Sequence, residues 1–517
     1  MNGFIPKVGY LSEPLLEFKY GQRLAYPRDG LFLYGPVGDA SSLKSVRYGV
    51  IGTPEGVRRF KAWSSTIRRF IDIPVPGPRS RAVEPQHVPF PGFEEAFHAE
   101  WPAEPLSLLA DIDPFELDRV LKIQNRHEAI RSAVDLFVKR LIEENNRTEN
   151  PPSVWFVIIP ELVYQLGRPL SKVKKSERIQ GVIAISEKRA RKLDPNEPSL
   201  FGIDEIEAQV YKYATHFRRQ LKARLLKDQI VTQIVRETTL TPEEFKRDNG
   251  MPLRRLEDRA TIAWKLSTGA YYKAGGRPWQ LADVRSGVCY VGLVYKRSEL
   301  TTNPKHSCCA AQMFLSNGDG IVFRGALGPW FHTDTKQFHL DETAAKNLIG
   351  MVINEYSRMH NAPPRELFIH AKSAFTQEEW RGFEAGCPGG TNLVGVQIID
   401  TRDDLKLFRP GEYPVIRGTT MRISDTRAYL WTSGYVPRLD TYMGPETPNP
   451  ISVRILRGDC ALDTVLSDVL GLTKINFNSC LHNDRLPVTI RFANAIGDVL
   501  VAAPMDGDPK LPFKFYI

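Results

Sequence analysis

The run VWFVIIPEL at residues 154–162 is apolar at nearly every position. Because a strand with one exposed face alternates apolar and polar side chains, this continuous run predicts a strand buried on both faces of a parallel sheet. The run VRYGVIGTP at residues 46–54 has the same character and is closed by glycine and proline. The other elements predicted in this half are helices over 127–145, 205–227 and 257–271 and a strand over 229–235. Strands that alternate with helices predict an open α/β sheet.

A second pattern begins after GGRPW at residues 275–279. Three apolar stretches follow one another with short connections, and helices then alternate with strands. The stretches are CYVGLVYK at 289–296, CCAAQMFL at 308–315 and GIVFRGAL at 320–327, and the later elements are a helix over 342–360, ELFIHAK at 366–372, a helix over 377–386 and LVGVQIID at 393–400. Three adjacent strands followed by alternating helices and strands are the outline of a ribonuclease H-like domain.

These two patterns divide the chain into an arm and two domains. Residues 1–40 are rich in glycine and proline and predict an extended arm with one short strand. We therefore expect the N-terminal arm over 1–40, a first domain over 41–276 and a second domain over 277–517.

The charge and the cysteines limit the class of protein. The formal net charge of +9 favours an anionic partner without naming it. The six cysteines form no C-x-x-C pair, which favours a reduced, cytoplasmic protein. No stretch approaches the roughly 20 apolar residues of a membrane helix, and the N-terminus lacks the apolar core of a signal peptide. We expect no membrane partner.

Cationic side chains gather in two segments of the middle third, HFRRQLKARLLKDQIVTQIVRE and KLSTGAYYKAGG. Arg218 and Lys222 are four residues apart on an expected helix, so they lie on the same side of it. Gln233 adds a neutral donor from the next strand, and Lys273 comes just before two glycines, where the backbone can approach a ligand closely. A terminal phosphate needs several such donors. The combination predicts a pocket for a nucleic-acid 5′-phosphate, whereas the helix alone also fits a solvated basic face.

These residues resemble a known motif. Lys222, Gln233 and Lys273 are similar to the 5′-phosphate motif of the MID domain in Argonaute proteins. Arg218 takes the position where many members of that family have tyrosine, and His216 is a second candidate for the same role. The segments EPLLEFKYG, near the N-terminus, and LTKINFNSCLHNDRLPVTIRFANAIGDVL, at 472–500, also resemble short prokaryotic Argonautes. The resemblance implies a Rossmann-like MID domain followed by a ribonuclease H-like Piwi domain, without a PAZ domain.

The resemblance also implies a role for Ile517 at the end of the chain. In Argonautes the C-terminal carboxylate often points into the MID pocket and helps to hold a divalent cation that bridges guide phosphates. A hard cation with oxygen ligands suits that place. We therefore expect Mg²⁺ at the guide 5′-phosphate, with an ordinary buried terminus as the alternative.

The resemblance further implies that the nuclease ligands are missing. A Piwi domain that cuts its target uses acidic side chains to hold two divalent metals. The catalytic positions of the family fall at Val294, at Ala371 and at Asn494, none of which is a carboxylate. Lys372, beside the second position, would further disfavour a metal. The spare acids Asp400, Asp403 and Asp404 are expected to be surface loop residues.

The function implied is that of a catalytically inactive short prokaryotic Argonaute. Such a protein would hold a short guide RNA and pair it with a complementary single-stranded DNA target. It would thereby activate a second, APAZ-containing protein with a sirtuin-like or TIR NAD-consuming effector, less often a nuclease, in prokaryotic defence. Two alternatives stay open: a Piwi-type endonuclease with a relocated metal site, and a nucleic-acid-binding protein that uses no guide.

Overall fold

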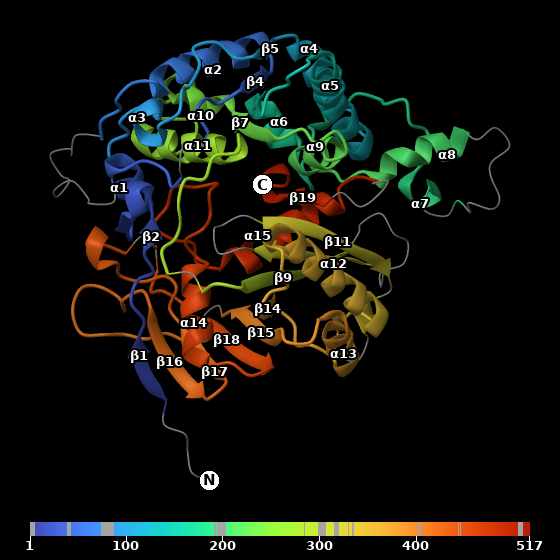
Figure 1. The fold of residues 1–517 in the computed structure, drawn as a ribbon. Helices are drawn as coiled ribbons and strands as arrows, with labels where there is room; N and C mark the ends of the chain where they lie inside the picture. Colours follow the sequence, from blue (N-terminus) through green and yellow to red (C-terminus); the bar gives the residue numbers. More distant parts are fainter. Residues whose placement is uncertain are drawn as a thin grey trace.

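The computed structural model describes residues 6–38, 43–73, 87–190, 193, 203–283, 285–297, 307–314, 320–328, 330–332, 336–401, 405–442, 444, 446–504 and 510–517. Its elements form two α/β halves, drawn one above the other in Figure 1, with the C-terminus between them. None of the described helices is both long and apolar enough to cross a membrane.

The first half is built on a four-stranded parallel sheet in the order β5-β4-β6-β7. Its strands are β4 (Tyr48–Ile51), β5 (Ser107–Leu109), β6 (Val154–Ile159) and β7 (Thr232–Arg236). All of β6 is buried, and its side chains alternate between two cores, with Phe156 on one face and Trp155 on the other. The continuous apolar run is thus confirmed as a buried central strand.

Helices cover both faces of this sheet. On the face of Phe156 lie α2 (Pro54–Ile67) and α11 (Arg259–Lys273), and on the face of Trp155 lie α5 (Arg126–Arg147) and α9 (Phe217–Leu225). Shorter helices connect them: α3 (Phe93–Phe97), α4 (Pro114–Leu121), α6 (Glu161–Leu166), α7 (Glu187–Ala190), α8 (Ile203–Ala208) and α10 (Glu237–Leu240). A parallel sheet between two helical layers is the expected Rossmann-like arrangement.

The single helix expected over 205–227 is wrong. The helix α8 ends at Ala208 and α9 begins at Phe217, with extended backbone at Tyr213 and at His216. Between them the Ala214 amide donates a 2.9 Å hydrogen bond to the carbonyl of Ala502, in the second half of the chain. A continuous helix would use that amide internally, so a contact distant in sequence decides the break.

The second half is built on a ten-stranded sheet in the order β1-β16-β17-β18-β15-β14-β9-β10-β11-β19. Its strands after the arm are β9 (Val288–Arg297), β10 (Ser307–Phe314), β11 (Gly320–Gly328), β14 (Glu366–Ala371), β15 (Asn392–Asp400), β16 (Thr419–Ser424), β17 (Arg427–Leu430), β18 (Ile451–Arg457) and β19 (Leu511–Pro512), and β12 (Phe331–His332) pairs separately with β13 (Gln337–Phe338). The strands β9, β10 and β11 are antiparallel neighbours, whereas β14 runs parallel to β9 and β15. The ribonuclease H-like outline is confirmed.

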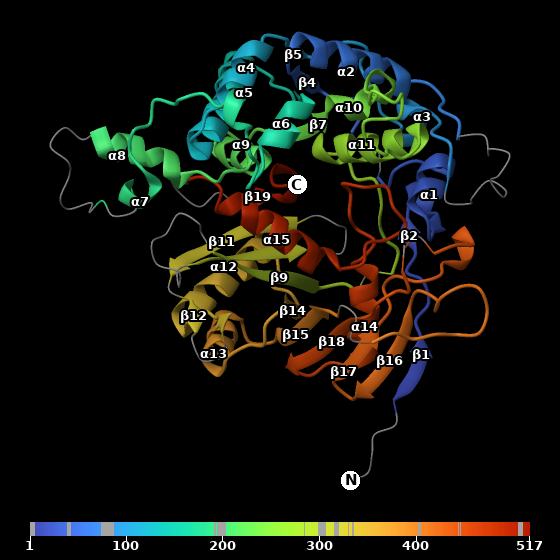
Figure 2. The same cartoon turned by 180° about the vertical axis from the view of Figure 1, so that it is seen from behind.

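Helices cover this sheet unevenly (Figure 2). The helices α12 (Glu342–His360) and α13 (Gln377–Gly386) pack on one face, over β9 and β14. The helices α14 (Leu462–Gly471) and α15 (Val488–Leu500) pack on the opposite face. The helix α15 therefore lies between the sheet and the first half of the chain.

The N-terminal arm contacts both halves. Its strand β1 (Lys7–Tyr10) pairs with β16, and β2 (Leu16–Glu17) pairs with β3 (Arg23–Leu24) and with β8 (Gln280–Leu281). The expectation of an extended arm with one short strand is wrong, because α1 (Pro27–Leu33) is helical. Pro27 and Asp29 occupy its first turn, where both residue types favour a helix start. A Cβ on Gly30 would lie 2.1 Å from the Phe18 ring, so glycine permits the packing.

The helix α15 packs closely against β9 at Gly292, and Gly292→Ala is expected to destabilise the fold. A Cβ there would lie 2.1 Å from the carbonyl oxygen of Thr489. Relieving that overlap should lower the free energy of unfolding by about 2 kcal/mol or more. The control is Gly350→Ala on α12, where a Cβ meets nothing within 4 Å and alanine favours the helix by about 1 kcal/mol. Denaturant unfolding curves measure both, and equal stabilities would contradict the prediction.

Candidate nucleic-acid phosphate site

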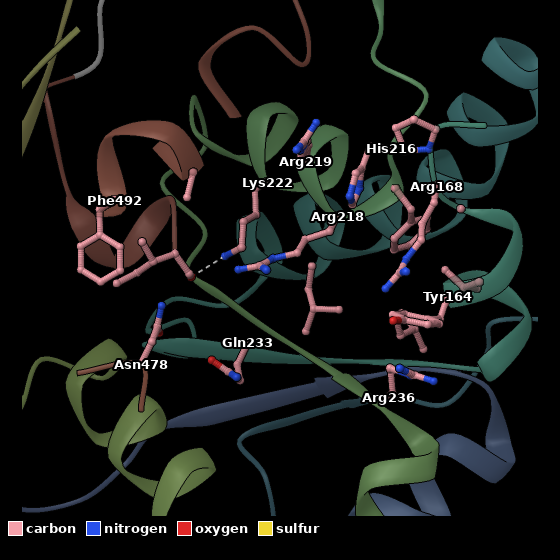
Figure 3. A pocket seen from close by; sticks show the side chains of 18 of the residues that line it. Tyr164, Arg168, His216, Arg218, Arg219, Lys222, Gln233, Arg236, Asn478 and Phe492 are labelled. Carbon is pink, nitrogen blue, oxygen red and sulfur yellow. Dashed lines mark hydrogen bonds between the residues drawn. The ribbon is translucent and has the colours of Figure 1, made fainter. Parts of the chain in front are cut away.

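A cavity of about 840 Å³ lies between the two halves of the chain. Its walls come from α6, α9, β7 and α11 on one side, and from α15, the segment before it and Ile517 on the other. The cavity brings together all six residues that the sequence indicated: His216, Arg218, Lys222, Gln233, Lys273 and Ile517. Figure 3 shows Arg218 and Lys222 pointing into the same space from α9.

Two buried lysines form the centre of the cavity. The side chains of Lys222 and Lys273 come from different helices, and each residue is only 2% exposed. Both Nζ atoms donate to the Thr232 carbonyl oxygen at 3.2 Å. Lys222 also donates to the main-chain oxygen of Ile517 at 2.7 Å, and Lys273 donates to Oε1 of Gln233. The two ammonium groups are therefore held close together, mainly by neutral oxygens.

The electrostatics of these groups indicate a shortage of negative charge. The pKa of Lys222 lies well below its ordinary value because of burial, and then because of the charges of Lys273 and Arg218. Burial and the charge of Arg218 lower the pKa of Lys273 in the same way. Burial, followed by the charge of Arg219, lowers the pKa of Arg218. An anion in the cavity would reverse these shifts, because it favours the charged form of each group.

Arg218 and His216 offer different kinds of contact. Within the part of the chain that the structure describes, Arg218 has no ion pair. Burial, followed by the charges of Arg219 and Arg218, lowers the pKa of His216 to about 4, so its imidazole is neutral near pH 7. Its Nδ1 is buried and has no hydrogen-bond partner among the described atoms. Arg218 can thus supply charge to an anion, whereas His216 can supply only a neutral hydrogen bond.

Three other cations around the cavity are already neutralised. Three arginines that line it each pair with a carboxylate: Arg219 with Asp498 at 2.5 Å, Arg236 with Glu161 at 2.6 Å and Arg491 with Asp484 at 2.7 Å. These pairs shape the rim without adding free charge. The cations that line the cavity without an ion pair among the described residues are Arg218, Lys222 and Lys273, which the sequence identified, and Arg168, which it did not.

Sequence reasoning missed an aromatic wall at the far end of the cavity. The ring of Tyr164 lies between two guanidinium groups, with the Cζ atoms of Arg168 and Arg236 each 3.4 Å from its centroid. All three residues line the cavity. Tyr164 and Arg168 follow the end of β6, and Arg236 is the last residue of β7. Because α/β sheets bind ligands at the carboxyl ends of their strands, this position was the sequence signal that could have identified the three residues.

Two oxygen atoms in the cavity are of the type that a divalent cation takes, and the prediction of Mg²⁺ there stays a prediction. The main-chain oxygen of Ile517 and Oε1 of Gln233 are each held by a lysine ammonium group. Both are hard oxygen donors, the type that Mg²⁺ takes, although Mg²⁺ usually completes its coordination with water and phosphate oxygens. A protein-only metal site is not present: no group of three or more His, Cys, Asp or Glu side chains in the described part of the chain could hold a metal.

The nuclease positions lie on two faces of the second sheet. Val294 is buried on the face that packs against α15, and Asn494 is an exposed residue of α15 itself. Ala371 instead packs with α12 and α13 on the opposite face. Because side chains alternate along a strand, the residues of this segment on the face of Val294 are His370, whose Nδ1 lies 2.9 Å from Oγ1 of Thr489 on α15, and Lys372.

Val294 and Ala371 thus pack on opposite faces of the sheet, and the assignment of Ala371 to the second metal-ligand position stays a prediction. Neither His370 nor Lys372 is a carboxylate, and His370 is buried, with its pKa lowered to about 3 by burial. Of the spare acids, Asp400 forms an ion pair with Arg485. Asp403 and Asp404 lie outside the described residues.

Phosphate binding is expected to be accompanied by proton uptake. The folded chain holds Lys222 and Lys273 with pKa values well below 10.5, and a bound phosphate raises them. Affinity for a 5′-phosphate should therefore fall as the pH rises through the folded pKa values. The stability of the free chain changes with pH in the opposite direction. Between the folded pKa values and 10.5, the lysines of the unfolded chain bind more protons than those of the folded chain, so the free energy of unfolding rises with pH. Calorimetric titrations in two buffers of different ionisation enthalpy measure the uptake, and buffer-independent heats would contradict it.

Comparisons with known proteins agree with this geometry. No protein-family model matches the chain. Over 283 residues it is 22% identical to the protein argonaute of Aquifex aeolicus (strain VF5), a match that covers 54% of this chain and 35% of that protein.

Solved structures match over the whole length of the chain. The Clostridium butyricum Argonaute bound to a guide DNA and a 19-mer target DNA superposes with a TM-score of 0.58 at 13% identity, covering 100% of this chain and 56% of that one. The A. aeolicus Argonaute superposes with a TM-score of 0.53 at 15% identity, covering 98% of this chain and 54% of that one. The chain thus spans about half the length of these structures, which fits MID and Piwi domains without a PAZ domain. The chain therefore has the Argonaute fold, and the predicted resemblance to Argonaute proteins is confirmed at the level of the fold.

Proposed function

We propose that this chain binds a short 5′-phosphorylated guide strand and pairs it with a complementary target. The observation that carries the proposal is the convergence of Arg218, Lys222 and Lys273 in one cavity, where the lysines are buried with depressed pKa values. A terminal phosphate carries nearly two negative charges, whereas an internal phosphodiester carries one, so the cavity favours a strand end. The similar C. butyricum Argonaute structure contains a guide DNA and a target DNA, which supports the same class of ligand.

In this proposal the guide is RNA and the target is single-stranded DNA, as the resemblance to short prokaryotic Argonautes implies. The target would be selected by base pairing, while the protein holds the backbone. The cavity extends from the lysines to Tyr164, whose ring lies between the guanidinium groups of Arg168 and Arg236, and a base would stack on this ring in place of one of those groups. Ile517 and Gln233 would hold Mg²⁺, which supplies positive charge to the guide phosphates.

The proposal assigns no cleavage to this chain. Val294, Asn494, His370 and Lys372 offer no carboxylate at the places where a cutting Piwi domain needs one. Target pairing would instead activate an associated protein, which we take to be an APAZ-containing effector that consumes NAD or, less often, degrades nucleic acid. The chain would then act as the recognition subunit of a prokaryotic defence system.

The proposal is tested by the nucleic acid that copurifies with the chain. We expect short strands with 5′-phosphates, identified by sequencing libraries prepared with and without prior phosphorylation. Their release should increase steeply with salt, because phosphate contacts depend on counterion release. Strands of random length with mixed 5′ ends would instead favour a nucleic-acid-binding protein that uses no guide.

A further inference from the structure

The outer face of the sheet formed by β1, β16, β17 and β18 meets the core under α12 and α13 at Leu456 of β18, and no other helix packing is seen on it among the described residues. The helix α14 packs on the inner face, where it meets Ala428 and Val453. The helices α12 and α13 lie on the outer side, but they pack over β9 and β14. Figures 1 and 2 both place α13 beside β15 and α14 beside β17 and β18.

A row that is apolar except for the buried Ser452 crosses this outer face; it is called the apolar row below. The strand registers place five residues opposite one another on neighbouring strands: Val8, Met421, Tyr429, Ser452 and Ile399. Val8 is 61% exposed and Ile399 is 42% exposed, so the two ends of the row are open to solvent. Tyr10, two residues further along β1 on the same face, is 55% exposed. With about 4.8 Å between strands, the row extends over roughly 19 Å.

A basic row lies next to the apolar row. Arg427 is directly opposite Arg454, and Arg454 is opposite Gln397. Like charges directly opposite each other destabilise a sheet, and neither arginine has an ion pair in the part of the chain that the structure describes. Arg427 lies over the Tyr429 ring and donates to its hydroxyl at 3.2 Å, which joins the two rows. Among the described residues, no carboxylate forms an ion pair with Arg427 or Arg454.

We propose that this outer face docks a protein partner that presents apolar side chains bordered by carboxylates. Carboxylates would compensate the opposed guanidinium groups, and the apolar side chains would bury the row from Val8 to Ile399. A nucleic-acid backbone could satisfy the arginines but would leave the apolar row in water. The edge strand β1 adds a second mode of contact, because its outer backbone groups can pair with a strand of the partner.

The position of the face permits guide and partner to be bound together. The cavity is lined by Arg491, Phe492 and Ala495 of α15, and α15 packs on the inner face of the sheet. A partner on the outer face therefore leaves the cavity open. The inference rests on the proposed function in one respect, that the partner is the effector activated by target pairing.

The test uses the full chain and, as the probe, the product of the neighbouring gene. Dissociation constants are measured by biolayer interferometry for the wild type, for Arg427→Glu with Arg454→Glu, and for Met421→Asp. The matched controls are Arg68→Glu with Arg69→Glu, at the exposed end of α2, and Phe115→Asp, at an 85% exposed position on α4. We expect at least a tenfold weaker complex for both face variants and a change below twofold for both controls.

Guide affinity and self-association are measured on the same variants. Unchanged partner binding by the face variants, or no complex with the wild type, overturns the inference. If the face variants bind the guide more weakly, the face binds nucleic acid instead. If only their self-association is weaker, the face is a contact between copies of this chain. Protection of β1 and β16 from hydrogen exchange in the wild-type complex is expected as well, and it tests the site without a variant. A chain that binds the partner through this face but no guide would refute the proposed function alone.

Discussion

Replacing Lys222 and Lys273 together by alanine is expected to abolish the preference for a 5′-phosphorylated guide over a 5′-hydroxyl guide. Each lysine loses a charge-assisted contact of about 1.5–3 kcal/mol, so the pair should account for a loss on the order of 10² to 10⁴-fold. The loss should be confined to the phosphorylated guide, because both guides share every other contact. Fluorescence anisotropy with two guides that differ only at the 5′ end measures the ratio directly.

Two controls separate loss of the pocket from loss of the fold. Lys265 lies on α11, the helix that also carries Lys273, and it is ion-paired with Glu257. Lys265→Ala should leave the ratio of the two guide affinities unchanged. Replacing Lys222 and Lys273 by methionine keeps much of their volume while it removes two buried charges, so the melting temperature should not fall. If the double variant retains the preference, the 5′-phosphate is bound elsewhere.

The second large effect is an expected absence of cleavage. Enzymes accelerate their reactions by roughly 10⁶-fold or more, so an active site of any kind would be obvious in a target-cutting assay. We expect a labelled target paired to a loaded guide to stay intact with Mg²⁺ or Mn²⁺. The physical reason is that Val294, Ala371 and Asn494, the residues at the expected metal-ligand positions, carry no carboxylate to hold two metals.

A metal-dependent cut near the guide centre that disappears on chelation would contradict this expectation. Products that persist with a chelator would indicate a contaminating nuclease. Asp498→Asn supplies a further control, because Asp498 is a carboxylate of α15 that forms ion pairs with Lys296 and Arg219. If a relocated metal site used Asp498, cleavage would be lost in this variant.

Patterns local in the sequence were sufficient to predict the central strands and to group the cationic residues of the pocket. The run at β6 is apolar throughout because both of its faces are covered, and that burial is visible in the composition of the strand itself. The pocket residues could be grouped because Arg218 and Lys222 share a helix face and Lys273 ends α11. The resemblance added His216 and Ile517, which no local pattern connects to the lysines.

The errors arose where distant contacts decide the structure. The helix expected through 213–216 is interrupted by the bond from Ala214 to Ala502. The helix α1 packs Gly30 on Phe18, a contact between residues that sequence periodicity does not relate. The face of the sheet on which Ala371 lies likewise depends on the register of β14 with β9, which no local pattern contains. A one-residue shift in such a register moves a side chain to the other side of the sheet.

The cavity has a consequence for how the molecule unfolds. Its walls come from both halves of the chain, with Lys222 and Lys273 on one side and Asn478, Arg491 and Ile517 on the other. A ligand that binds only the assembled cavity adds its binding free energy to the contact between the halves, about 2.7 kcal/mol at a free concentration 100 times the dissociation constant. Guide loading should therefore make the two halves melt as one cooperative unit. A guide strand would thus serve as a structural element of the folded protein as well as its source of sequence information.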